Sequence, residues 1–597
     1  MLEYSTLAIE RRGGLPVKKS ESYRRVRLTE SYWPADESRP LIELTLGDAL
    51  RAAAAECPNR CALVEGVADR ERRRRWTYAE LLQSAEQVAA ALLRTFSPGE
   101  RIAVWSANVP EWVLLLYGSA LAGVVLVTVN PAYKSRELEY VLGNSGAAGL
   151  FTMDEYRGAN CLAIVEGVRA RLPALREVIR ICEFEEFLAG AAGRQRLPQL
   201  SPADRCIIMF TSGTTGAQKG VEFHHRGIVN VTHFTQERGG LAVGGVFVNP
   251  MPMFHIGSLG HAGVGAVMRR ATHVLASEWN RNLFMDLVQS ERGTYSLLVP
   301  TMIEAILASD RRADYDLSSL TNIVSGAAIV EASLIERART ELGSTICNIY
   351  GQTEMQGVIS AVHCDDSRED QARTIGQPMP RVEVKIGDPQ SGQVLPLGVQ
   401  GEIYVRGYQT MIGYFNMPAE TAKALEPDGW LHSGDLGTMD ERGFLKITGR
   451  IKDLIKRGGE AIYPREIENL LLEHPKVANA AVVGIPDRYW GEQVAAVIIP
   501  RLPGEPPAAA ELHDFCRANL ASYKTPLIWC FTDAFAATET GKLQKFKLVE
   551  SIVKGELAAQ TVEPSTPAAS TTEPVGSHAS TAEPVSPRGA SPVGRTV

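Results

Sequence analysis

The 597-residue sequence lacks an excess of positive charge, since 62 Lys and Arg residues stand against 69 Asp and Glu residues. A net charge of −7 gives no global field that would attract nucleic acid or an anionic membrane. Cysteine is sparse and scattered, with nine residues, no CxxC pair and no zinc-type histidine spacing. Reduced thiols, and an N-terminus without the apolar region of a signal peptide, favour a cytoplasmic protein. A small-molecule enzyme is therefore the class to test first.

Long hydrophobic runs are also almost absent, and only one stretch approaches the length of a membrane span. Residues 112–129, WVLLLYGSALAGVVLVTV, are 18 positions without a charge. Gly118 and Gly123 interrupt this run, and its second half is β-branched whereas its first half is rich in Leu and Ala. These features predict a buried helix that turns at Gly123 into a buried strand, not a transmembrane segment. We find no lipid anchor, so we expect any membrane contact to be peripheral.

The sequence does have the composition of an ordinary globular protein, with 45% hydrophobic and 22% charged residues. Between about residues 45 and 450, helical patterns such as YAELLQSAEQVAAALLRTF alternate with short apolar runs such as RIAVWSA and TICNIYG. This alternation predicts an α/β fold with largely parallel sheets that are covered on both faces. Residues 381–448 differ, because short alternating strands between Gly, Pro and Asp turns indicate a small antiparallel sheet or barrel.

The pattern changes again after Arg450, where a helix following Pro464 and strands such as ANAAVVGI predict a compact α+β unit. The expected parts are an N-terminal extension, a large domain, a small C-terminal domain and a tail, with bounds 1–40, 41–450, 451–554 and 555–597. The tail is rich in Pro, Ser and Thr and repeats Glu-Pro every ten residues. Such a segment buries too little apolar surface to offset the entropy of ordering, which predicts disorder.

A run of basic residues at Arg70–Arg75 admits two interpretations. It resembles a patch for polyphosphate or nucleic acid in its charge alone. The run is isolated in a net-acidic chain, however, and it ends at the strand-like segment Trp76–Tyr78. We therefore expect a solvated surface loop.

The most specific motif follows the apolar run CIIMF and consists of small hydroxyl residues and glycines with one lysine. Such a loop lets backbone amides and hydroxyls surround phosphate oxygens, while the lysine adds a positive charge. The motif is neither a Walker A loop nor GxGxxG, which disfavours a P-loop ATPase and a dinucleotide enzyme. The candidate phosphate-binding residues are Thr211, Ser212, Gly213, Thr214, Thr215, Gly216 and Lys219.

With this loop and the ordered motifs that follow it, about residues 40–550 resemble the AMP-forming adenylating superfamily of acyl-CoA synthetases, luciferases and peptide-synthetase adenylation domains. The resemblance implies a large N-terminal lobe of two doubly covered sheets plus a small β-barrel-like subdomain, hinged to a small α+β C-terminal lobe. It also implies ATP, Mg²⁺ and coenzyme A as cofactors or substrates. The family usually has proline where this chain has Gln218, but the lysine and the hydroxyls are retained.

The second motif is NIYGQTE, residues 348–354, again at the end of an apolar run. By resemblance, Tyr350 stacks on adenine and Glu354 holds the magnesium ion. An aromatic face suits a purine, and a hard cation beside a triphosphate needs carboxylate oxygens. The resemblance assigns the other nucleotide contacts to Gly351, Gln352 and Thr353, and to Gly326, Ala327 and Ala328 of a small-residue turn.

Polar residues around the expected lobe junction form the third group. By resemblance, Asp435 takes the two ribose hydroxyls, which a carboxylate can do because it accepts twice. Arg450, 15 positions later, would reach the ribose or a phosphate, and Lys452 would be the hinge. Glycines in the next loop would allow close approach of the backbone to the pantetheine arm of CoA. The residues of that loop are Gly458, Gly459 and Glu460.

Three residues are assigned to catalysis by resemblance. Lys542, in the TGK segment near the C-terminus, would place an ammonium group between the attacking carboxylate and the α-phosphate and stabilise the transition state. Lys545 and Lys547 are nearby alternatives. His255, in the motif PMFH, would lie at the acyl pocket and the entrance to the pantetheine tunnel, and Thr353 would contact phosphate.

The sequence therefore predicts an AMP-forming acyl-CoA synthetase, closest in motifs to fatty-acyl-CoA synthetases, that converts an acid through acyl-AMP to acyl-CoA. Apolar residues near the expected pocket favour an aliphatic or aryl acid over a polar amino acid, and they include Ile256, Val299, Met302 and Val324. Among such acids we expect a medium- or long-chain fatty acid. Two alternatives are an acyl-AMP ligase that donates to a carrier protein and a non-catalytic nucleotide-binding scaffold. No fused carrier domain is expected, and a scaffold would not need Lys542. No oligomeric state is indicated.

Overall fold

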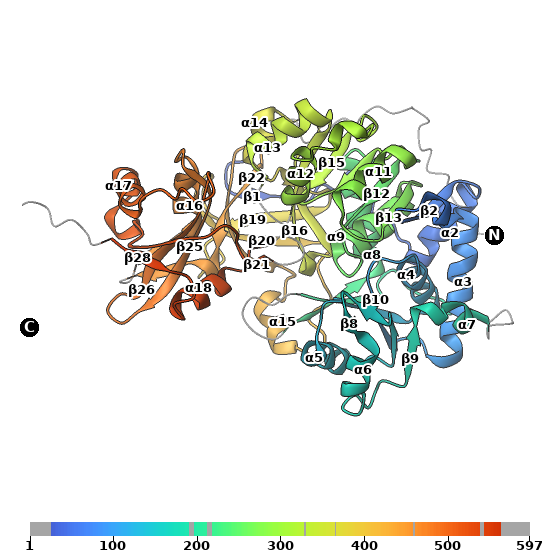
Figure 1. The fold of residues 1–597 in the computed structure, drawn as a ribbon. Coiled ribbons are helices and arrows are strands. Elements are labelled where there is room, and N and C mark those ends of the chain that lie inside the picture. Colours follow the sequence, from blue (N-terminus) through green and yellow to red (C-terminus); the bar gives the residue numbers. More distant parts are fainter. Residues whose placement is uncertain are drawn as a thin grey trace, which may run out of the picture.

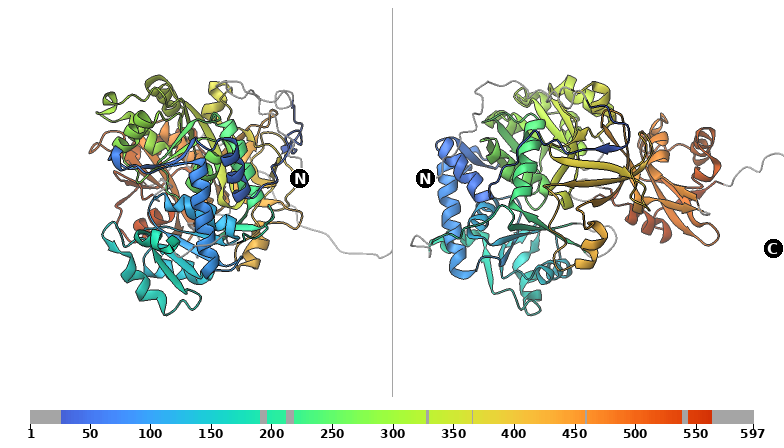
Figure 2. Two further views of the ribbon diagram at one scale, coloured as in Figure 1. Left: turned by 90° about the vertical axis from the view of Figure 1, so that its right-hand side faces the viewer. Right: turned by 180° about the vertical axis from the view of Figure 1, so that it is seen from behind.

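The structure is a computed structural model that describes residues 26–189, 196–211, 218–326, 330–364, 366–457, 460–537 and 543–562. Figure 1 shows a large lobe and a smaller one that contains α16, α17 and α18. The large lobe ends with β22 (Leu445–Arg450) and the small lobe starts with β23 (Ile455–Arg457). The predicted two-lobe α/β architecture is confirmed, and the right-hand view of Figure 2 shows the same division from behind.

The first sheet of the large lobe has six strands in the order β11-β10-β5-β4-β6-β9. All neighbours are parallel except β10 and β11, which form an antiparallel pair at one edge. Its apolar strands are buried on both faces, and α5 (Ser135–Ser145) and α6 (Cys161–Arg169) cover one of them. The strands are β4 (Arg101–Trp105), β5 (Val125–Val129), β6 (Gly149–Thr152), β9 (Glu177–Arg180), β10 (Arg205–Phe210) and β11 (Gly220–His224).

The second sheet has nine strands in the order β18-β17-β16-β15-β14-β12-β13-β2-β3. Its middle strands are parallel, and antiparallel strands close both edges. The strands that matter for the site are β12 (Val246–Asn249), β15 (Asn322–Ser325), β16 (Thr345–Gln352) and β17 (Gly357–Ala361). The carboxyl end of β15 lies beside Asn348 of β16, which brings the turn after Ser325 next to the start of the NIYGQTE motif.

The apolar run at residues 112–129 forms α4 (Glu111–Ala122) and β5, as predicted. All 12 residues of α4 are buried, because the helix belongs to the main hydrophobic cluster that joins the two large sheets. Gly123 ends the helix with a left-handed φ of 68°, a conformation that glycine adopts without steric cost. None of the helices in the described ranges has the length and apolar composition needed to traverse a bilayer.

A third, antiparallel sheet of five strands contains the segment that the sequence predicted as a small sheet or barrel. Its order is β1-β19-β20-β21-β22, with β19 at Val382–Gly387, β20 at Gly401–Gly407 and β21 at Leu431–Met439. The edge strand β1 (Tyr32–Trp33) pairs with β19 and comes from the expected N-terminal extension. Trp33 is 3% exposed, so the extension contributes to the fold of the large lobe from residue 26 onward.

The expectation of a solvated loop at Arg70–Arg75 is confirmed for the other residues of the run, which are exposed, but it is wrong for Arg73. The side chain of Arg73 is 1% exposed and forms ion pairs with Asp286 at 2.6 Å and Glu291 at 2.9 Å. Both acids belong to α11 (Arg281–Glu291), and Arg75 also pairs with Glu291 at 2.7 Å. These arginines join the edge of the nine-stranded sheet to α11, which also removes the basis for a phosphate patch.

The small lobe is a mixed sheet in the order β24-β23-β26-β27-β28, with β25 (Val477–Asp487) paired to β26 (Gly491–Pro500). Its helices are α16 (Pro464–Leu472), α17 (Ala509–Asn519) and α18 (Lys545–Val553). The expected tail boundary at residue 555 is wrong, because β28 (Ala559–Thr561) pairs with β27 (Ile528–Phe531). The Glu-Pro repeats from residue 563 onward lie outside the described residues.

Candidate active site

The predicted phosphate loop connects the antiparallel strands β10 and β11. The register pairs Phe210 with Gly220, and the amide of Thr211 donates to the carbonyl of Lys219 over 3.0 Å. This bond closes the base of the loop and fixes the backbone of both residues. Ser212, Gly213, Thr214, Thr215 and Gly216 lie outside the described residues, so the structure places only the two ends of the predicted loop.

The side chain of Lys219 is held between an acid and an aromatic ring. Its ammonium nitrogen lies 2.7 Å from Glu420 Oε2 and 4.7 Å from the centre of the Tyr414 ring. Glu420 belongs to α15 (Pro418–Ala424), which begins with proline at its first turn. Hydrogen bonds from Lys219 and from Lys423 lower the pKa of Glu420 to about 2, so this carboxylate is ionised at neutral pH.

Glu354, the predicted magnesium ligand, lies in the short helix η6 (Thr353–Met355) directly after β16. The hydroxyl of Tyr414 donates to Glu354 Oε1 over 2.9 Å, and the amide of Met411 donates to the carbonyl of Glu354 over 2.9 Å. Burial, reinforced by the charge of Glu354, raises the pKa of Tyr414, which keeps the hydroxyl protonated as a donor. Tyr414 therefore contacts both Lys219 and Glu354.

A second group of side chains converges on Asp435, the predicted ribose ligand. Asp435 is 5% exposed and lies in β21. Its Oδ2 accepts from the hydroxyl of Tyr350 at 2.8 Å and from Gln352 Nε2 at 2.9 Å. Burial and the charge of Asp435 raise the pKa of Tyr350 well above its usual value, so the phenol remains a donor. The structure thus brings Tyr350, Gln352 and Asp435 together.

The predicted interlobe residues follow this group. Arg450, the last residue of β22, is opposite Asp435 in the register, and its Nε lies 2.9 Å from Asp435 Oδ1. Lys452 lies in the short helix η7 (Ile451–Asp453), between the last strand of the large lobe and the first strand of the small one. Desolvation, and then the charge of Arg450, lower the pKa of Lys452. The predicted hinge is therefore next to the predicted ribose site.

Two of the predicted glycines are required by close backbone contacts. A Cβ atom on Gly351 would lie 2.0 Å from the carbonyl oxygen of Gly357, because β16 and β17 bend tightly around η6. A Cβ atom on Gly326 would lie 2.7 Å from the carbonyl oxygen of Ile349. These glycines allow the turn after β15 to pack directly on β16. The turn continues into Ala327 and Ala328, which lie outside the described residues.

His255 is half-buried and caps the short helix α9 (Ile256–Ser258), a few residues after β12. Its ring packs against Phe254 with a centroid distance of 4.2 Å. Burial lowers the pKa of His255 to about 4, so the imidazole is neutral at physiological pH. In the part of the chain that the structure describes, the ring forms no hydrogen bond with the groups around Asp435 or Lys219. Its predicted role at the acyl pocket stays a prediction.

Of the residues predicted in the small lobe, Glu460 starts β24 (Glu460–Ile462) and is exposed, while Gly458, Gly459 and Lys542 lie outside the described residues. The ends of the segment that contains Lys542 are joined by a bridge between Ala537 and Leu543. Lys545, which the sequence left as an alternative to Lys542, instead forms structural contacts. Its ammonium lies 2.6 Å from the buried Glu468 and donates to the carbonyl of Val482, which fixes α18 to the lobe.

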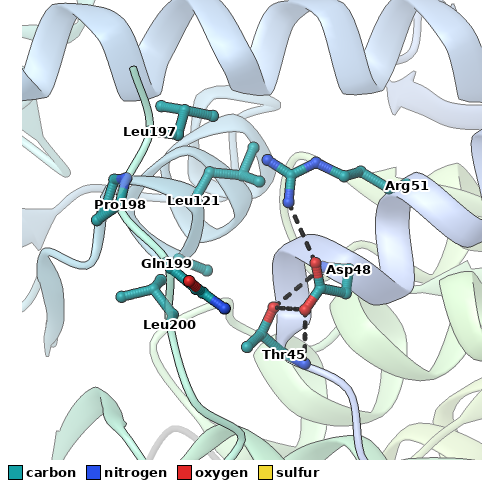
Figure 3. A pocket seen from close by; sticks show the side chains of 9 residues that line it. Thr45, Asp48, Arg51, Leu121, Leu197, Pro198, Gln199 and Leu200 are labelled. Carbon is teal, nitrogen blue, oxygen red and sulfur yellow. Dashed lines mark hydrogen bonds and ion pairs between the residues drawn. The ribbon is translucent and has the colours of Figure 1, made fainter. Parts of the chain in front are cut away.

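A cavity of about 410 Å³ lies elsewhere in the large lobe and contains none of the predicted site residues (Figure 3). It is lined by the start of α2 (Leu46–Glu56), the end of α4 and residues 197–200. Its acid, Asp48, accepts from the backbone and hydroxyl of Thr45 in a capping box and pairs with Arg51 at 3.1 Å. The polar groups of this cavity therefore stabilise the helix start.

Sequence reasoning missed Tyr414 and Glu420. The contact between Lys219 and Glu420 spans 201 residues, and neither Tyr414 nor Glu420 belongs to a motif that we could interpret from the sequence. The local backbone gives no signal either, because Glu420 follows Pro418 in an ordinary helix start. Only the tertiary structure reveals that both residues contact the predicted phosphate ligand Lys219 and that Tyr414 also contacts the predicted metal ligand Glu354.

Comparisons with known proteins agree with this arrangement. The family model described as AMP-binding enzyme matches residues 50–415, and the model of the C-terminal domain of AMP-binding enzymes matches residues 466–542. A putative acyl-CoA synthetase, YngI of Bacillus subtilis, is 36% identical over 551 residues, covering 86% of this chain and 98% of the relative. The human mitochondrial medium-chain acyl-CoA ligase ACSF2 is 34% identical over 558 residues, with coverages of 87% and 90%.

Among solved structures, ATP-bound MatB from Rhodopseudomonas palustris superposes with a TM-score of 0.77 at 26% identity. The match covers 85% of this chain and 99% of MatB. The extent of these matches shows that the chain belongs to the AMP-binding enzyme family. Within that family it is an AMP-forming acid–CoA ligase, a class of acyl-CoA synthetases whose substrates include ATP and CoA.

Proposed function

We propose that this enzyme activates a medium- or long-chain fatty acid, using the residues around Asp435 for the nucleoside and those around Lys219 for the triphosphate. The observation that carries the proposal is the continuity of residues 350–354. Tyr350 and Gln352 contact Asp435, and two residues later Glu354 contacts Tyr414 beside Lys219. One strand end therefore connects a buried carboxylate suited to ribose with a lysine and an acid suited to a metal-bound phosphate chain.

The nucleoside end of the proposed site uses hydrogen bonding and stacking. Asp435 would accept from the ribose hydroxyls. An ionised carboxylate offers about four acceptor positions, so the three present donors leave one for the first hydroxyl, and the second hydroxyl would replace one of these donors. The ring of Tyr350 would stack on adenine while its hydroxyl stays on Asp435. Arg450 holds the other carboxylate oxygen, which keeps the Asp435 side chain oriented.

The phosphate end uses charge. Lys219 would contact the phosphate oxygens, and Glu354 would hold Mg²⁺ through the oxygen that Tyr414 leaves available. The donor set fits this ion, because Mg²⁺ is usually bound by one or two carboxylates together with waters and substrate phosphates. When bound, Mg²⁺ neutralises charge on the phosphates that leave as pyrophosphate. Within the described ranges, no cluster of three or more His, Cys, Asp and Glu side chains could enclose a metal ion without such a substrate.

Two further groups complete the proposed chemistry. Lys542 would place its ammonium group at the carboxylate of the acid and the α-phosphate as the mixed anhydride forms. In the second step the thiol of CoA attacks the acyl carbon and AMP leaves. The loop with Gly458, Gly459 and Glu460 would face the pantetheine arm, and Lys452 would let the small lobe rotate between the two steps.

The chain length of the acid rests on apolar residues expected at the acyl pocket, to which His255 is also assigned. Ile256 follows it in α9, and Val299 and Met302, which are 4% and 5% exposed, lie at the start of α12 (Pro300–Leu307). A neutral His255 adds no charge to such surroundings. The name of the human relative, a medium-chain acyl-CoA ligase, supports the same class of acid.

The test is ATP–pyrophosphate exchange with saturated acids from four to eighteen carbons and with aryl acids, followed by CoA-dependent release of AMP. We expect exchange to be highest with acids of about eight or more carbons and AMP release to require CoA. Exchange with aryl or short acids alone would overturn the assigned substrate class. Exchange without CoA-dependent thioester formation would instead favour transfer to a carrier protein, and no exchange with any acid would favour a nucleotide-binding scaffold.

A further inference from the structure

The side chain of Tyr414 lies between two groups that are assigned to the triphosphate. Its ring lies 4.7 Å from Lys219 Nζ and its hydroxyl is 2.9 Å from Glu354 Oε1. Tyr414 itself is 8% exposed. A single rigid aromatic side chain therefore spans the distance between the ammonium group of Lys219 and the carboxylate of Glu354.

The backbone around Tyr414 is fixed to β11, the strand that follows Lys219. Phe415 donates to the carbonyl of Gly220 over 2.7 Å, and Ile412 donates to the carbonyl of Glu222 over 3.0 Å. An isolated bridge pairs Val221 with Tyr414 itself. Since these bonds tie the segment to the same strand that positions Lys219, the relative placement of the two side chains is set by backbone geometry.

The carboxylate of Glu420 occupies the position beside the Lys219 ammonium group at which an anionic ligand would bind. The distance of 2.7 Å is that of a charge-assisted hydrogen bond, and the lysine side chain is 32% exposed. A phosphate oxygen that approaches Lys219 competes with this carboxylate. Glu420 has a second cation, Lys423, at 2.6 Å, which is 71% exposed. When Lys219 turns to another anion, Glu420 therefore keeps a charged partner.

We propose that Tyr414 and Glu420 are positioning residues for adenylation: Tyr414 sets the spacing of Lys219 and Glu354, and Glu420 holds Lys219 until the triphosphate replaces it. This inference rests on the proposed function, which assigns Lys219 to phosphate and Glu354 to Mg²⁺. It gives Glu420 the role of a competitor with ATP for a single ammonium group. Removing its charge should therefore strengthen ATP binding, whereas loss of a supporting residue would weaken it.

The first experiment measures the Kd of MgATP by titration calorimetry, without acid or CoA. Glu420→Gln keeps the shape of the side chain and removes its charge. We expect the Kd to fall about two- to five-fold, the scale of an exposed ion pair. Lys219→Ala should raise the Kd, and adding Glu420→Gln to it should then change nothing. Glu511→Gln is the matched control, because Glu511 pairs with Lys476 at 2.9 Å in the small lobe.

The outcomes separate this inference from the proposed function. If Lys219→Ala leaves the Kd unchanged, the assignment of Lys219 to phosphate is wrong. If Lys219→Ala weakens binding but Glu420→Gln has no effect, or acts equally with and without Lys219, then Glu420 does not compete with the nucleotide. Either of the last two results overturns the inference and leaves the phosphate assignment intact.

The second experiment tests Tyr414 through the dependence of pyrophosphate exchange on Mg²⁺. Tyr414→Phe keeps the ring beside Lys219 and removes the bond to Glu354. We expect the Mg²⁺ concentration for half-maximal rate to rise about ten-fold, because a hydrogen bond to a charged group is lost, while the KM for the acid is unchanged. Tyr32→Phe is the control, since it removes a similar bond to Glu383 of 2.6 Å away from the site. The role of Tyr414 would be contradicted if the Mg²⁺ concentration for half-maximal rate and the KM for the acid changed equally. It would also be contradicted if the Mg²⁺ dependence did not change.

Discussion

Asp435 and Arg450 face each other across β21 and β22, and the guanidinium Nε lies 2.9 Å from the carboxylate. Arg450 is also the last residue before the connection to the small lobe. A movement of the small lobe that pulls on this connection acts directly on the partner of the proposed ribose ligand. The nucleoside site and the interlobe connection are therefore linked through one ion pair.

Asp435→Asn should weaken nucleotide binding selectively. The amide cannot accept from two ribose hydroxyls as well as a carboxylate does, and Arg450 loses its countercharge. We expect the KM for ATP in pyrophosphate exchange to rise about 10- to 100-fold, as for the loss of hydrogen bonds to a charged group. The preference for ATP over 2′-deoxy-ATP should shrink as well. Asp440→Asn, which breaks another Asp–Arg pair in the same hairpin, is the control and should leave both values unchanged.

Lys542→Ala should separate the two half-reactions. Without the ammonium group at the reacting carboxylate, we expect pyrophosphate exchange to fall by a factor of about 10² or more. Conversion of supplied acyl-AMP and CoA to thioester should continue, because that step forms no new bond to phosphate. Lys547→Ala on the exposed side of α18 is the matched control. Equal loss in the two assays would show that Lys542 does not act in adenylation alone.

Lys545→Met should lower the stability of the small lobe without a selective loss of pyrophosphate exchange. The substitution leaves Glu468, 5% exposed, without the ammonium group at 2.6 Å. We expect a loss of about 2–3 kcal/mol in the unfolding of the small lobe, measured by calorimetry. A second change, Glu468→Gln, should recover part of this loss because it removes a buried charge that has lost its nearest partner and keeps only Arg465 at 3.6 Å. A selective loss of pyrophosphate exchange at unchanged stability would instead make Lys545 a catalytic candidate.

Acid should destabilise the protein through buried histidines. Burial lowers the pKa of His273 to about 3. It lowers the pKa of four other histidines to about 4, namely His225, His233, His255 and His261. Between pH 6.5 and about 4 the unfolded chain binds more protons at these sites than the folded chain does, so stability falls as the pH falls. We expect the Tm to decrease steadily from pH 7 to pH 5.

The matched variant for this effect is His273→Gln. The ring of His273 lies 3.1 Å from the amide of Asn249 and is 2% exposed, so glutamine retains polarity without a titrating group. The slope of the unfolding free energy against pH should decrease by about the amount that one titrating proton contributes. This holds even if the variant is less stable at every pH. An unchanged slope would show that His273 does not take part in the acid effect.

The parts of the molecule that could be predicted from the sequence are those with contiguous signals. The run at residues 112–129 predicted α4 and β5 because its glycine and its change from Leu-rich to β-branched composition are local. The motif at residues 348–354 placed Tyr350, Gln352 and Glu354 on one strand end for the same reason. Local patterns of this kind do not depend on which distant segment packs against them.

The parts that could not be predicted depend on contacts between distant residues. Arg73 reads as a solvated charge until Asp286, 213 residues away, is known to lie beside it. The role of Glu420 likewise follows only from its contact with Lys219, 201 residues earlier. Charge patterning along the chain describes only sequence neighbours, and the free energy of a buried ion pair depends on partners that such patterning cannot reveal.

The hydrophobic clusters have a consequence for how such chains can be recombined. Within the described ranges, the clusters of the large lobe include no residue after Ile447, and those of the small lobe start at Ile455. Substitutions in one interior therefore need no compensating change in the other. A crossover between Arg450 and Leu454 would join two intact interiors, so the small lobe of another family member could replace the native one and still fold. Selection for the thiol acceptor would then act on the small lobe, and selection for the acid substrate would act on the large lobe. The two lobes could be exchanged separately within one gene.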